Sequence, residues 1–361
     1  MQNSEYLLPL LRESQPRPIS SLFEKLLDAE INIAKGIRET ASTSQNHLRD
    51  FLAGEHGRDA TFPRVLSIKD SDFIGGSFAR HVKNWPLDDI DVYLPLDGHE
   101  LIYFGAGGIR LPYTVVTDNV LARNPLLAAR WTSGSVISSA KLINEFAAVL
   151  RRHYPDATDV YPNGEAVSIR MKQGETDQAD GLGYDVVPCF SLKPDNAFER
   201  PFYVIPDGRD GWIRTNPRHD HAVSEQLQND NGKTFRKAVK LVKFWNTERL
   251  GGAISSYYIE LAVARAFMER NAKGEYARNL SFAVALAFWA VNQAVIQGDQ
   301  ASWIAQAPPV KPGDLGAVQK LLLATATAFA LDAWAKEQAN DRLGALQAWK
   351  NTFGDKFPET A

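Results

Sequence analysis

The feature that most constrains this chain is a pair of aspartates, Asp89 and Asp91, that flank Ile90 and follow a turn containing Gly76 and Ser77. Side chains on a β-strand alternate between its two faces, so the two carboxylates share one face while Ile90 packs on the other. Such carboxylates repel each other unless a cation lies between them, and Mg²⁺ prefers oxygen ligands while keeping positions open for phosphates. We therefore expect Asp89 and Asp91 to bind a metal, with Mg²⁺ the favoured ion and Mn²⁺ the alternative.

The turn before the aspartates suits a phosphate group. Gly76 lets the backbone approach a ligand closely, Ser77 offers a hydroxyl, and a helix N-terminus presents free N–H groups. Asp88 is out of phase with Asp89 and Asp91, so we expect it to face away and do not count it as a ligand. The alternative for the pair is a solvated edge strand, although aspartate is poorly suited to strands. Turn and pair together indicate metal-dependent nucleotidyl transfer.

A third carboxylate, Asp185, is expected on a neighbouring strand. It is flanked by Tyr184 and Val186, which indicates a buried strand. A buried carboxylate without a partner costs several kcal/mol, which favours a metal or a cationic partner. The alternative is an aspartate that caps a turn after Gly181 and Gly183. As a ligand, Asp185 would complete a three-carboxylate metal site.

Composition excludes several classes of protein. The chain has 361 residues, 44% of them hydrophobic, which is ample for a sizeable core. Its 40 Lys and Arg against 43 Asp and Glu give a formal charge of -3, so no global basic field is available to grip long nucleic acids. The single cysteine, Cys189, excludes a disulfide framework and a multi-cysteine zinc site. We find no signal-peptide pattern and no apolar window of membrane-spanning length, so we expect a cytoplasmic protein with no membrane partner.

The order of local patterns predicts an α+β protein. Apolar spacing favours one long helix, or two abutting ones, up to residue 54, and a further helix at 135–154. Residues 73–96 are expected to form strand, turn, short helix and strand, and residues 159–217 a mostly antiparallel set of strands. Helical patterns follow at residues 232–247, 255–270, 280–297, 315–338 and 341–353. We therefore expect an N-terminal helix (1–54) that bridges a mixed-sheet core (55–217) and a C-terminal helical domain (218–361).

A short run of metal-binding residue types, His219, Asp220 and His221, lies where the strand pattern gives way to helices. No third ligand is evident nearby in the sequence, and turn signals surround the run. We expect it to be a surface turn.

The carboxylate motif resembles that of a known superfamily. Gly76-Ser77, Asp89-Ile90-Asp91 and the Asp185 strand resemble the catalytic core of the polymerase-beta-like nucleotidyltransferases. Within that superfamily the chain looks like the bacterial cyclic-oligonucleotide synthases, the CD-NTases, relatives of animal cyclic GMP-AMP synthase and of oligoadenylate synthase. The resemblance covers residues 73–260. Three stretches within that range narrow it to the CD-NTases: 186–190, 212–217 and 240–246. It implies a nucleotidyltransferase core plus a helical lobe, with the long first helix between the lobes.

The resemblance also implies roles for residues in the helical lobe. Lys243 would contact the donor triphosphate, Ser256 would bond a phosphate, and Tyr257 would stack on the donor base. From the residues alone, Lys243 lies on an apolar helix face and could extend its ammonium to water instead. Ser256 or the serine before it could equally be a helix N-cap, with Tyr257 packing beside it.

The family's reaction implies substrates and partners. A donor nucleoside triphosphate lies between the lobes, the ribose hydroxyl of a second nucleotide attacks its α-phosphate, pyrophosphate leaves, and a second round closes a ring. ATP, with GTP, CTP or UTP, would be the substrates, and a cyclic di- or trinucleotide would activate a downstream effector in bacterial anti-phage (CBASS) signalling. A HORMA-type or ubiquitin-transfer-like regulatory protein is a further partner in such systems. The zinc insert of the animal DNA sensor needs several cysteines, so we expect no DNA activator.

Two other functions stay open on the sequence. The same chemistry could make linear oligoadenylate, or place a nucleotide on a protein or small molecule. A catalytically inactive fold could sense a nucleotide by binding it, although the presence of all three carboxylates counts against this alternative.

Overall fold

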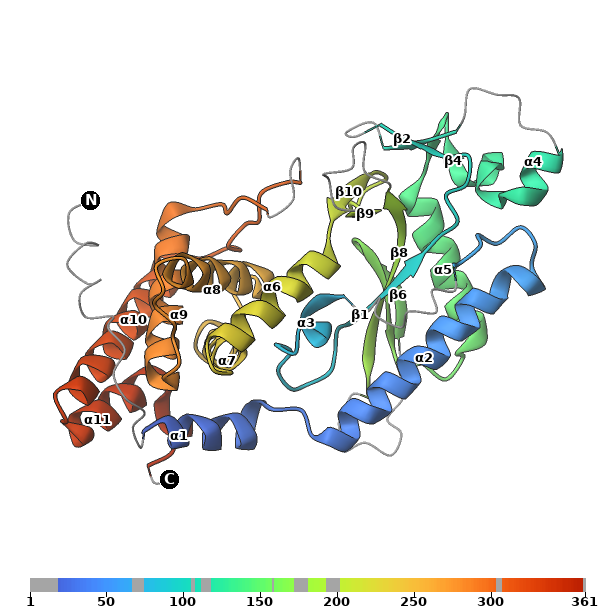
Figure 1. Cartoon of the computed structure of the whole chain (residues 1–361). Helices are drawn as coiled ribbons and strands as arrows, with labels where there is room; N and C mark the ends of the chain where they lie inside the picture. Colours follow the sequence, from blue (N-terminus) through green and yellow to red (C-terminus); the bar gives the residue numbers. More distant parts are fainter. Residues whose placement is uncertain are drawn as a thin grey trace.

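The computed structural model describes residues 19–66, 75–104, 108–111, 118–157, 159–171, 181–192, 202–302 and 307–359. Figure 1 shows a sheet-containing lobe beside a helical lobe, with the first helices of the chain running along both. The strand expected at Phe73 and Ile74 lies outside the described residues.

The sheet lobe is built around one long strand, β8 (Gly183–Leu192). The sheet order is β10 (Trp212–Thr215), β9 (Phe202–Pro206), β8, β7 (Ala166–Arg170) and β6 (Asp159–Asn163), all antiparallel to their neighbours. β1 (Ile90–Pro95) pairs with β8 and is parallel to it. The predicted mixed, mostly antiparallel sheet is thus confirmed, and β6 and β7 are joined by a two-residue turn of Gly164, at a φ of 57°, and Glu165.

A smaller sheet lies at the outer end of this lobe, together with short helices. Its order is β2 (Ile102–Tyr103), β3 (Ile109–Arg110), β5 (Val136–Ile137) and β4 (Thr132–Ser133). Nearby are α4 (Asp118–Arg123) and the 3₁₀ turns η4 (Pro125–Leu127) and η5 (Ala129–Trp131). The helix expected at 135–154 is α5 (Ser139–His153), which starts where the Ser138 hydroxyl accepts a hydrogen bond from the Lys141 N–H at 3.2 Å.

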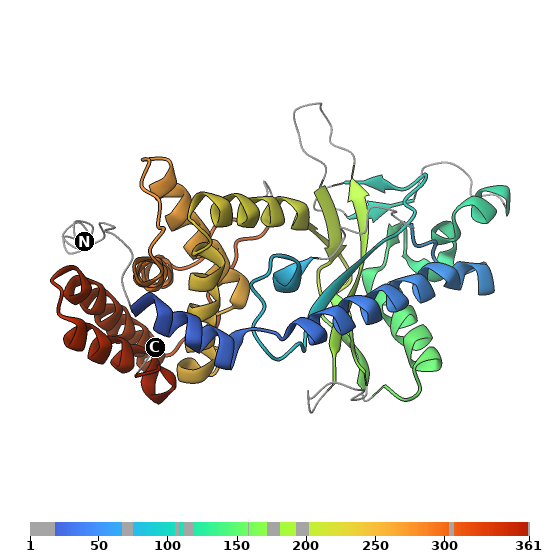
Figure 2. The same ribbon diagram turned by 60° about the horizontal axis from the view of Figure 1, so that its bottom comes forward.

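The N-terminal segment forms two helices, the second of the two arrangements expected from the sequence. α1 (Ile19–Leu26) continues as a π-helical turn, η2 (Leu27–Ile31), and α2 (Lys35–Arg58) follows after a break at residues 32–34. α1 contributes its buried side chains to the core of the helical lobe, whereas Leu48 and Leu52 of α2 belong to the core of the sheet lobe. The pair spans both lobes in two views (Figures 1 and 2). The break divides the apolar stripe between two separate cores.

The helical lobe contains six α-helices in the described part of the chain: α6 (Pro217–Asp230), α7 (Phe235–Leu250), α8 (Ser256–Asn271), α9 (Leu280–Gln297), α10 (Ala317–Gln338) and α11 (Arg342–Phe353), followed by a 3₁₀ turn, η6 (Gly354–Lys356). Five of these helices match the predicted ranges closely. α6 was not predicted, because its first turn is polar and starts at a proline that we interpreted as a boundary. We propose that the two hydrophobic cores are separate domains that meet near residue 217.

α9 is long and apolar enough to cross a membrane by length and composition, with a mean hydropathy of 1.5 over 18 residues. Of that helix, 67% is buried inside the protein, and it packs against α7, α8 and α10. The central helix of a protein core accounts for both observations.

Candidate active site

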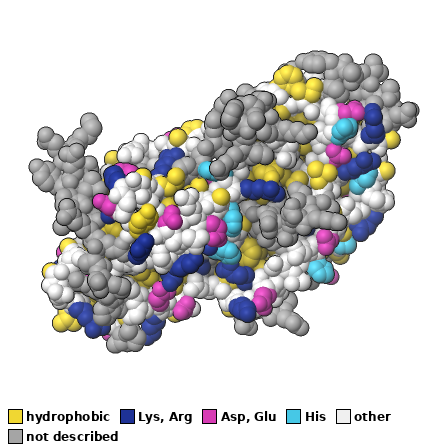
Figure 3. Space-filling view, in the orientation of Figure 1, with side chains coloured by type: hydrophobic (Ala, Val, Ile, Leu, Met, Phe, Trp, Pro, Cys, Tyr) yellow, Lys and Arg dark blue, Asp and Glu magenta, His cyan; other side chains and the backbone are white. Residues whose placement is uncertain are grey.

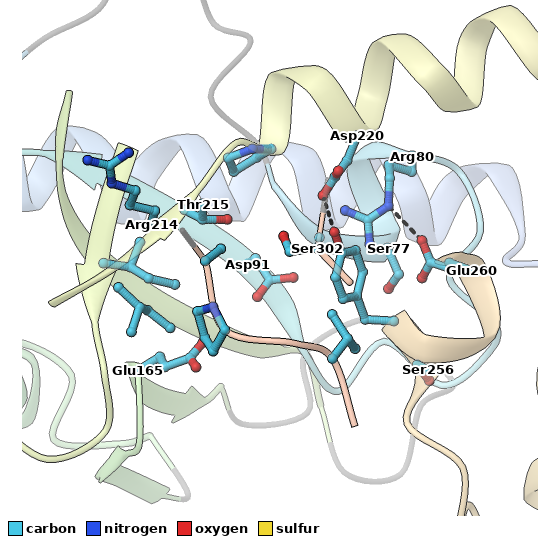
Figure 4. A pocket seen from close by; sticks show the side chains of 18 of the residues that line it. Ser77, Arg80, Asp91, Glu165, Arg214, Thr215, Asp220, Ser256, Glu260 and Ser302 are labelled. Atoms are coloured by element: carbon cyan, nitrogen blue, oxygen red, sulfur yellow. Dashed lines mark hydrogen bonds and ion pairs between the residues drawn. The ribbon is translucent and has the colours of Figure 1, made fainter. Parts of the chain in front are cut away.

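A cavity of about 380 Å³ opens where the two lobes meet. Gly76 and Ser77 of α3 (Gly76–Ala79) line it together with Asp89 and Asp91 from the sheet lobe. Figure 4 shows Ser77, Asp91, Asp220 and Ser256 around this space. Further lining residues from the sheet lobe are Glu165, Arg214 and Thr215, and from the helical lobe Tyr257, Glu260 and Ser302. The predicted turn and aspartate pair therefore lie at one site, opposite the predicted Ser256 and Tyr257.

Asp91 and Asp185 are brought side by side by the one parallel strand pair in the described sheets. Asp91 on β1 is the register partner of Asp185 on β8, so both side chains emerge on the same face of the sheet. Asp89 directly precedes β1 and lines the same cavity as Asp91. The alternatives considered from the sequence are wrong: β1 is buried at all its residues except Asp91, which is partly buried, and Asp185 lies within a strand, not at a turn.

The charges of these three carboxylates interact. Burial raises the pKa of Asp91 to about 7, and the neighbouring Asp89 and Asp185 add to this rise, while Arg80 and Lys83 oppose it. Burial also raises the pKa of Asp185, against a 2.5 Å hydrogen bond from the Ser168 hydroxyl that lowers it. Negative charge at this site is therefore incompletely compensated by the protein itself.

Gly75 and Gly76 in the turn cannot carry a side chain, because neighbouring atoms occupy the space where a Cβ would lie. Gly76 has a φ of 66°, and a Cβ at this position would lie 1.5 Å from Oδ2 of Asp91. A Cβ on Gly75 would lie 1.9 Å from the ring of Tyr93. The turn therefore rests directly on β1, and only glycine allows the backbone to reach the Asp91 carboxylate.

Asp88 and Asp89 share a cationic partner. The Lys83 ammonium lies 2.5 Å from Oδ1 of Asp88 and also forms an ion pair with Asp89. The expectation that Asp88 faces away from Asp89 is wrong, because both residues precede the strand and its alternation does not yet hold there. In the described part of the chain no three His, Cys, Asp or Glu groups already surround a metal position. The donor set nevertheless fits a divalent cation, since Asp91 and Asp185 are adjacent and Asp89 could join them by leaving Lys83.

A buried charge network links the turn to the helical lobe. Arg80, at the end of α3, donates from Nε to Oε2 of Glu260 at 2.6 Å, and the Lys243 ammonium lies 2.5 Å from Oε1 of the same carboxylate. Lys243 also donates to the Val82 carbonyl at 3.3 Å and is only 6% exposed. It neither reaches solvent, the alternative considered from the sequence, nor lines the cavity. The two cations lower the pKa of Glu260 although burial alone would raise it, so Glu260 stays ionised.

Tyr257 lines the cavity but its hydroxyl is engaged. It donates to Oδ2 of Asp220 at 3.1 Å, and the Arg80 guanidinium lies 5.6 Å from the centroid of its ring. Burial raises the pKa of Asp220 to about 6, while Arg80 and Tyr257 lower it. Figure 4 shows the hydrogen bond and the Arg80–Glu260 pair as dashed lines. The surface turn expected at residues 219–221 is wrong: these residues form the first turn of α6, and Asp220 faces the cavity.

Ser256 is the first residue of α8 and lines the cavity, whereas Ser255 occupies the N-cap without a side-chain capping bond. Sequence reasoning missed Arg80, Asp220 and Glu260 as site residues. Arg80 and Glu260 each carry a signal: Arg80 follows Ser77 by one helical turn, and Glu260 is the one acid within an otherwise apolar stretch of α8.

Several known proteins resemble this chain in sequence or in fold. No family model matches the chain. A probable cyclic nucleotide synthase from Bacillus cereus strain VD146 is 25% identical over 330 residues, which cover 86% of this chain and 90% of that protein. The solved structure of CdnC from E. coli MS115-1 with ATP superposes with a TM-score of 0.58 at 16% identity, covering 94% of this chain and 98% of that one.

Two further structures show the same fold. CdnC in complex with HORMA-deltaN gives a TM-score of 0.59 at 16% identity, over 94% of this chain and 98% of that one. The apo form of DncV from Vibrio cholerae gives 0.51 at 15% identity, over 94% of this chain and 85% of that one. The resemblance to the bacterial CD-NTases and the α+β fold that it implied are confirmed.

Proposed function

We propose that this chain, with the fold of the bacterial CD-NTases, is a Mg²⁺-dependent nucleotidyltransferase that joins ribonucleoside triphosphates into a cyclic di- or trinucleotide. The observation that carries the proposal is the alignment of Asp91 and Asp185 on parallel strands, with the Gly76 turn resting on Asp91 at the mouth of an interlobe cavity. The name of the Bacillus cereus relative, a probable cyclic nucleotide synthase, supports the same activity.

Each residue of the site has a defined task in this proposal. Asp89, Asp91 and Asp185 hold the metal, and bound Mg²⁺ would neutralise phosphate charge and activate the attacking hydroxyl. Gly76 and Ser77 offer a backbone N–H and a hydroxyl to the triphosphate of the donor. The acceptor hydroxyl forms a bond to the α-phosphorus, the bond to the β-phosphate breaks, and pyrophosphate leaves. The hydroxyl proton passes to the Asp185 carboxylate.

The helical lobe supplies the remaining contacts with the donor nucleotide. We propose that Ser256 bonds a phosphate and that the Tyr257 ring, held by Asp220, stacks on the donor base. For Lys243 to contact the triphosphate, its ammonium must exchange the Glu260 carboxylate for a phosphate oxygen. Without that exchange Lys243 acts on the site through Glu260 and Arg80.

The biological setting is proposed by analogy with the relatives. An ATP-bound CdnC structure supports ATP as a substrate, with GTP, CTP or UTP as the second nucleotide, and the CdnC:HORMA-deltaN complex supports a HORMA-type partner. We propose a cytoplasmic enzyme of anti-phage signalling whose product reaches a separate effector, without a DNA activator.

Product analysis tests this function. The purified chain is incubated with all four ribonucleotides and Mg²⁺, and the products are treated with phosphatase and identified by mass spectrometry. A phosphatase-resistant cyclic product is expected. A linear, phosphatase-sensitive oligoadenylate would replace the proposal by the linear synthase, and tight triphosphate binding without any product, with or without a HORMA-type partner, would replace it by a nucleotide sensor.

The substitution Gly76→Ala tests the role of the turn. An added Cβ would overlap the Asp91 carboxylate, and alanine disfavours the positive φ, so the turn must move away from β1. We expect nucleotide turnover to fall by at least about 100-fold, the scale of a misplaced binding group. Gly57→Ala is the matched control, because Gly57 lies in α2 with no atom within 4 Å of its added Cβ. Normal turnover by Gly76→Ala would contradict the role of this turn.

A further inference from the structure

Four basic side chains gather where α2, the residues after α3, and α7 meet, and we call them the Arg38 cluster: Arg38, His81, Arg236 and Lys240. Arg38 Nη1 and His81 Nδ1 lie 2.8 Å apart, and the Arg38 guanidinium lies 5.5 Å from the centroid of the Phe78 ring. In the middle of the face shown in Figure 3, near this junction, Lys, Arg and His side chains gather with an acidic side chain among them.

The positive charge of the Arg38 cluster exceeds the negative charge of the carboxylates near it. In the part of the chain that the structure describes, the acid that faces it is Glu225, which Arg236 already holds as an ion pair. His221 adds a further basic ring near His81. Lys243, the next cation along α7, is neutralised by Glu260 and not by an acid of the cluster. Within the described residues, neither Arg38 nor Lys240 therefore forms an ion pair with a carboxylate, and their two positive charges repel each other.

Lys240 is the most confined member of the cluster. It is 6% exposed, and its ammonium donates to Oδ1 of Asn32 at 2.9 Å. Asp28 reaches the cluster only indirectly, because it accepts a hydrogen bond from the same amide at 2.9 Å. Among the described residues one neutral oxygen accepts one of the three ammonium hydrogens, which leaves two available to a ligand there.

The directions of the pKa shifts in the cluster agree with this geometry. Burial lowers the pKa of Lys240 to about 8, and Arg38 and Lys243 contribute to the same direction. Burial, then Arg236 and Arg38, lower the pKa of His81 while Glu225 raises it. The cationic forms are thus disfavoured as the cluster stands, and an anion placed among them would oppose each of these shifts.

We propose that the Arg38 cluster is a second ligand site, which binds the phosphate group of a small molecule. The Arg38 guanidinium offers a planar fork of N–H donors, the Lys240 ammonium offers a point charge from α7, and the His81 ring is exposed to solvent. The site is distinct from the metal site, because none of its four residues lines the interlobe cavity. It is nevertheless adjacent to the active site in the chain, since His81 directly follows Arg80 and has a φ of 59°.

Thermal unfolding in the absence of divalent metal tests the proposal independently of catalysis. Pyrophosphate is the probe, with inorganic phosphate, citrate and sodium chloride compared at equal ionic strength. At about ten times its dissociation constant, pyrophosphate is expected to raise Tm by roughly 2 °C for a chain of this size. Equal shifts with pyrophosphate and chloride would show screening alone, and a larger shift with citrate would assign the site to carboxylates; either result overturns the phosphate site.

Three variants locate the effect. Lys240→Met and Arg38→Met should abolish the pyrophosphate shift, and Lys240→Met should also raise Tm in the absence of ligand because a confined charge is removed. Glu225→Gln should enlarge the shift, because it frees Arg236. Lys237→Met is the matched control: it removes the same charge from α7, where Lys237 pairs with Glu24 outside the cluster. An unchanged shift in Lys240→Met and Arg38→Met, or equal losses in all the lysine variants, would contradict the site.

Discussion

Replacing Asp91 by asparagine is expected to abolish nucleotide turnover and, at the same time, to stabilise the metal-free protein. Turnover should fall at least about a thousand-fold, the scale seen when a group that stabilises transition-state charge is removed. The asparagine side chain would keep the shape of the aspartate beside Gly76 and Asp185 but could not hold the metal as an anion. The two effects have opposite signs, so a general loss of folding cannot produce both.

The stability effect follows from the pKa of Asp91, which burial and two neighbouring carboxylates raise to about 7. A carboxyl with a raised pKa binds its proton more tightly in the folded state than in the unfolded chain. Without metal, the folded state therefore loses stability as the pH rises from about 4, where an unfolded aspartate ionises, through 7. At pH 8 the asparagine variant lacks this penalty and should melt at a higher temperature than the wild type.

Melting curves and turnover assays with and without Mg²⁺ check this prediction. Mg²⁺ should raise the Tm of the wild type and leave that of Asp91→Asn nearly unchanged. Asp88→Asn is the matched control, because Asp88 is a nearby aspartate that pairs with Lys83 and lies outside the ligand set, so most of the turnover should be retained. A loss of turnover in Asp91→Asn much smaller than about a thousand-fold, or a lower Tm than the wild type at pH 8, would refute the role assigned to Asp91.

Replacing Glu260 by alanine is expected to be the most destabilising single change at the site. It would leave Arg80 and Lys243 buried without a counter-charge, and breaking a buried ion pair in this way costs roughly 3–5 kcal/mol. That is a large share of the roughly 5–15 kcal/mol typical of a folded protein. Because Arg80 follows the Gly76 turn and Glu260 lies on α8, the contact between the lobes should also loosen.

Urea unfolding measures this effect. Glu260→Gln should lie between the wild type and Glu260→Ala, because it keeps one accepting oxygen for Arg80 or Lys243 but loses the charge and the second acceptor. Glu269→Ala is the matched control on the same helix: its pair with Lys273 is exposed, so the cost should stay below about 1 kcal/mol. Similar stabilities for Glu260→Ala and Glu269→Ala would show that the buried network does not hold the two lobes together.

The sequence predicts those elements whose pattern is local. The residues of α9 are apolar almost throughout and were placed with the correct ends, and the strand patterns predicted at residues 159–217 contain β6 to β10. The break at residues 32–34 was not predicted, because the apolar spacing continues through it. What divides α1 from α2 is the presence of two cores, which is a property of the tertiary fold.

At the candidate site, too, the sequence predicts local features but not tertiary contacts. The spacing of Asp89 and Asp91 is a local property, whereas the parallel register that aligns Asp91 with Asp185 is a matter of strand pairing. Arg80 and Glu260 are far apart in the chain, and neither residue alone indicates that it will be buried against the other. Lys243 was assigned to the triphosphate by resemblance, and its Glu260 partner could not be inferred from the helix pattern around it.

Release of pyrophosphate from a mixture of the four ribonucleoside triphosphates tests the central claim most directly. We predict steady release by the wild type with Mg²⁺, none after removal of the metal with EDTA, and none from Asp91→Asn or Asp185→Asn with Mg²⁺. Release that persists in either aspartate variant, or that is equal with and without metal, would contradict a three-carboxylate metal site for nucleotidyl transfer.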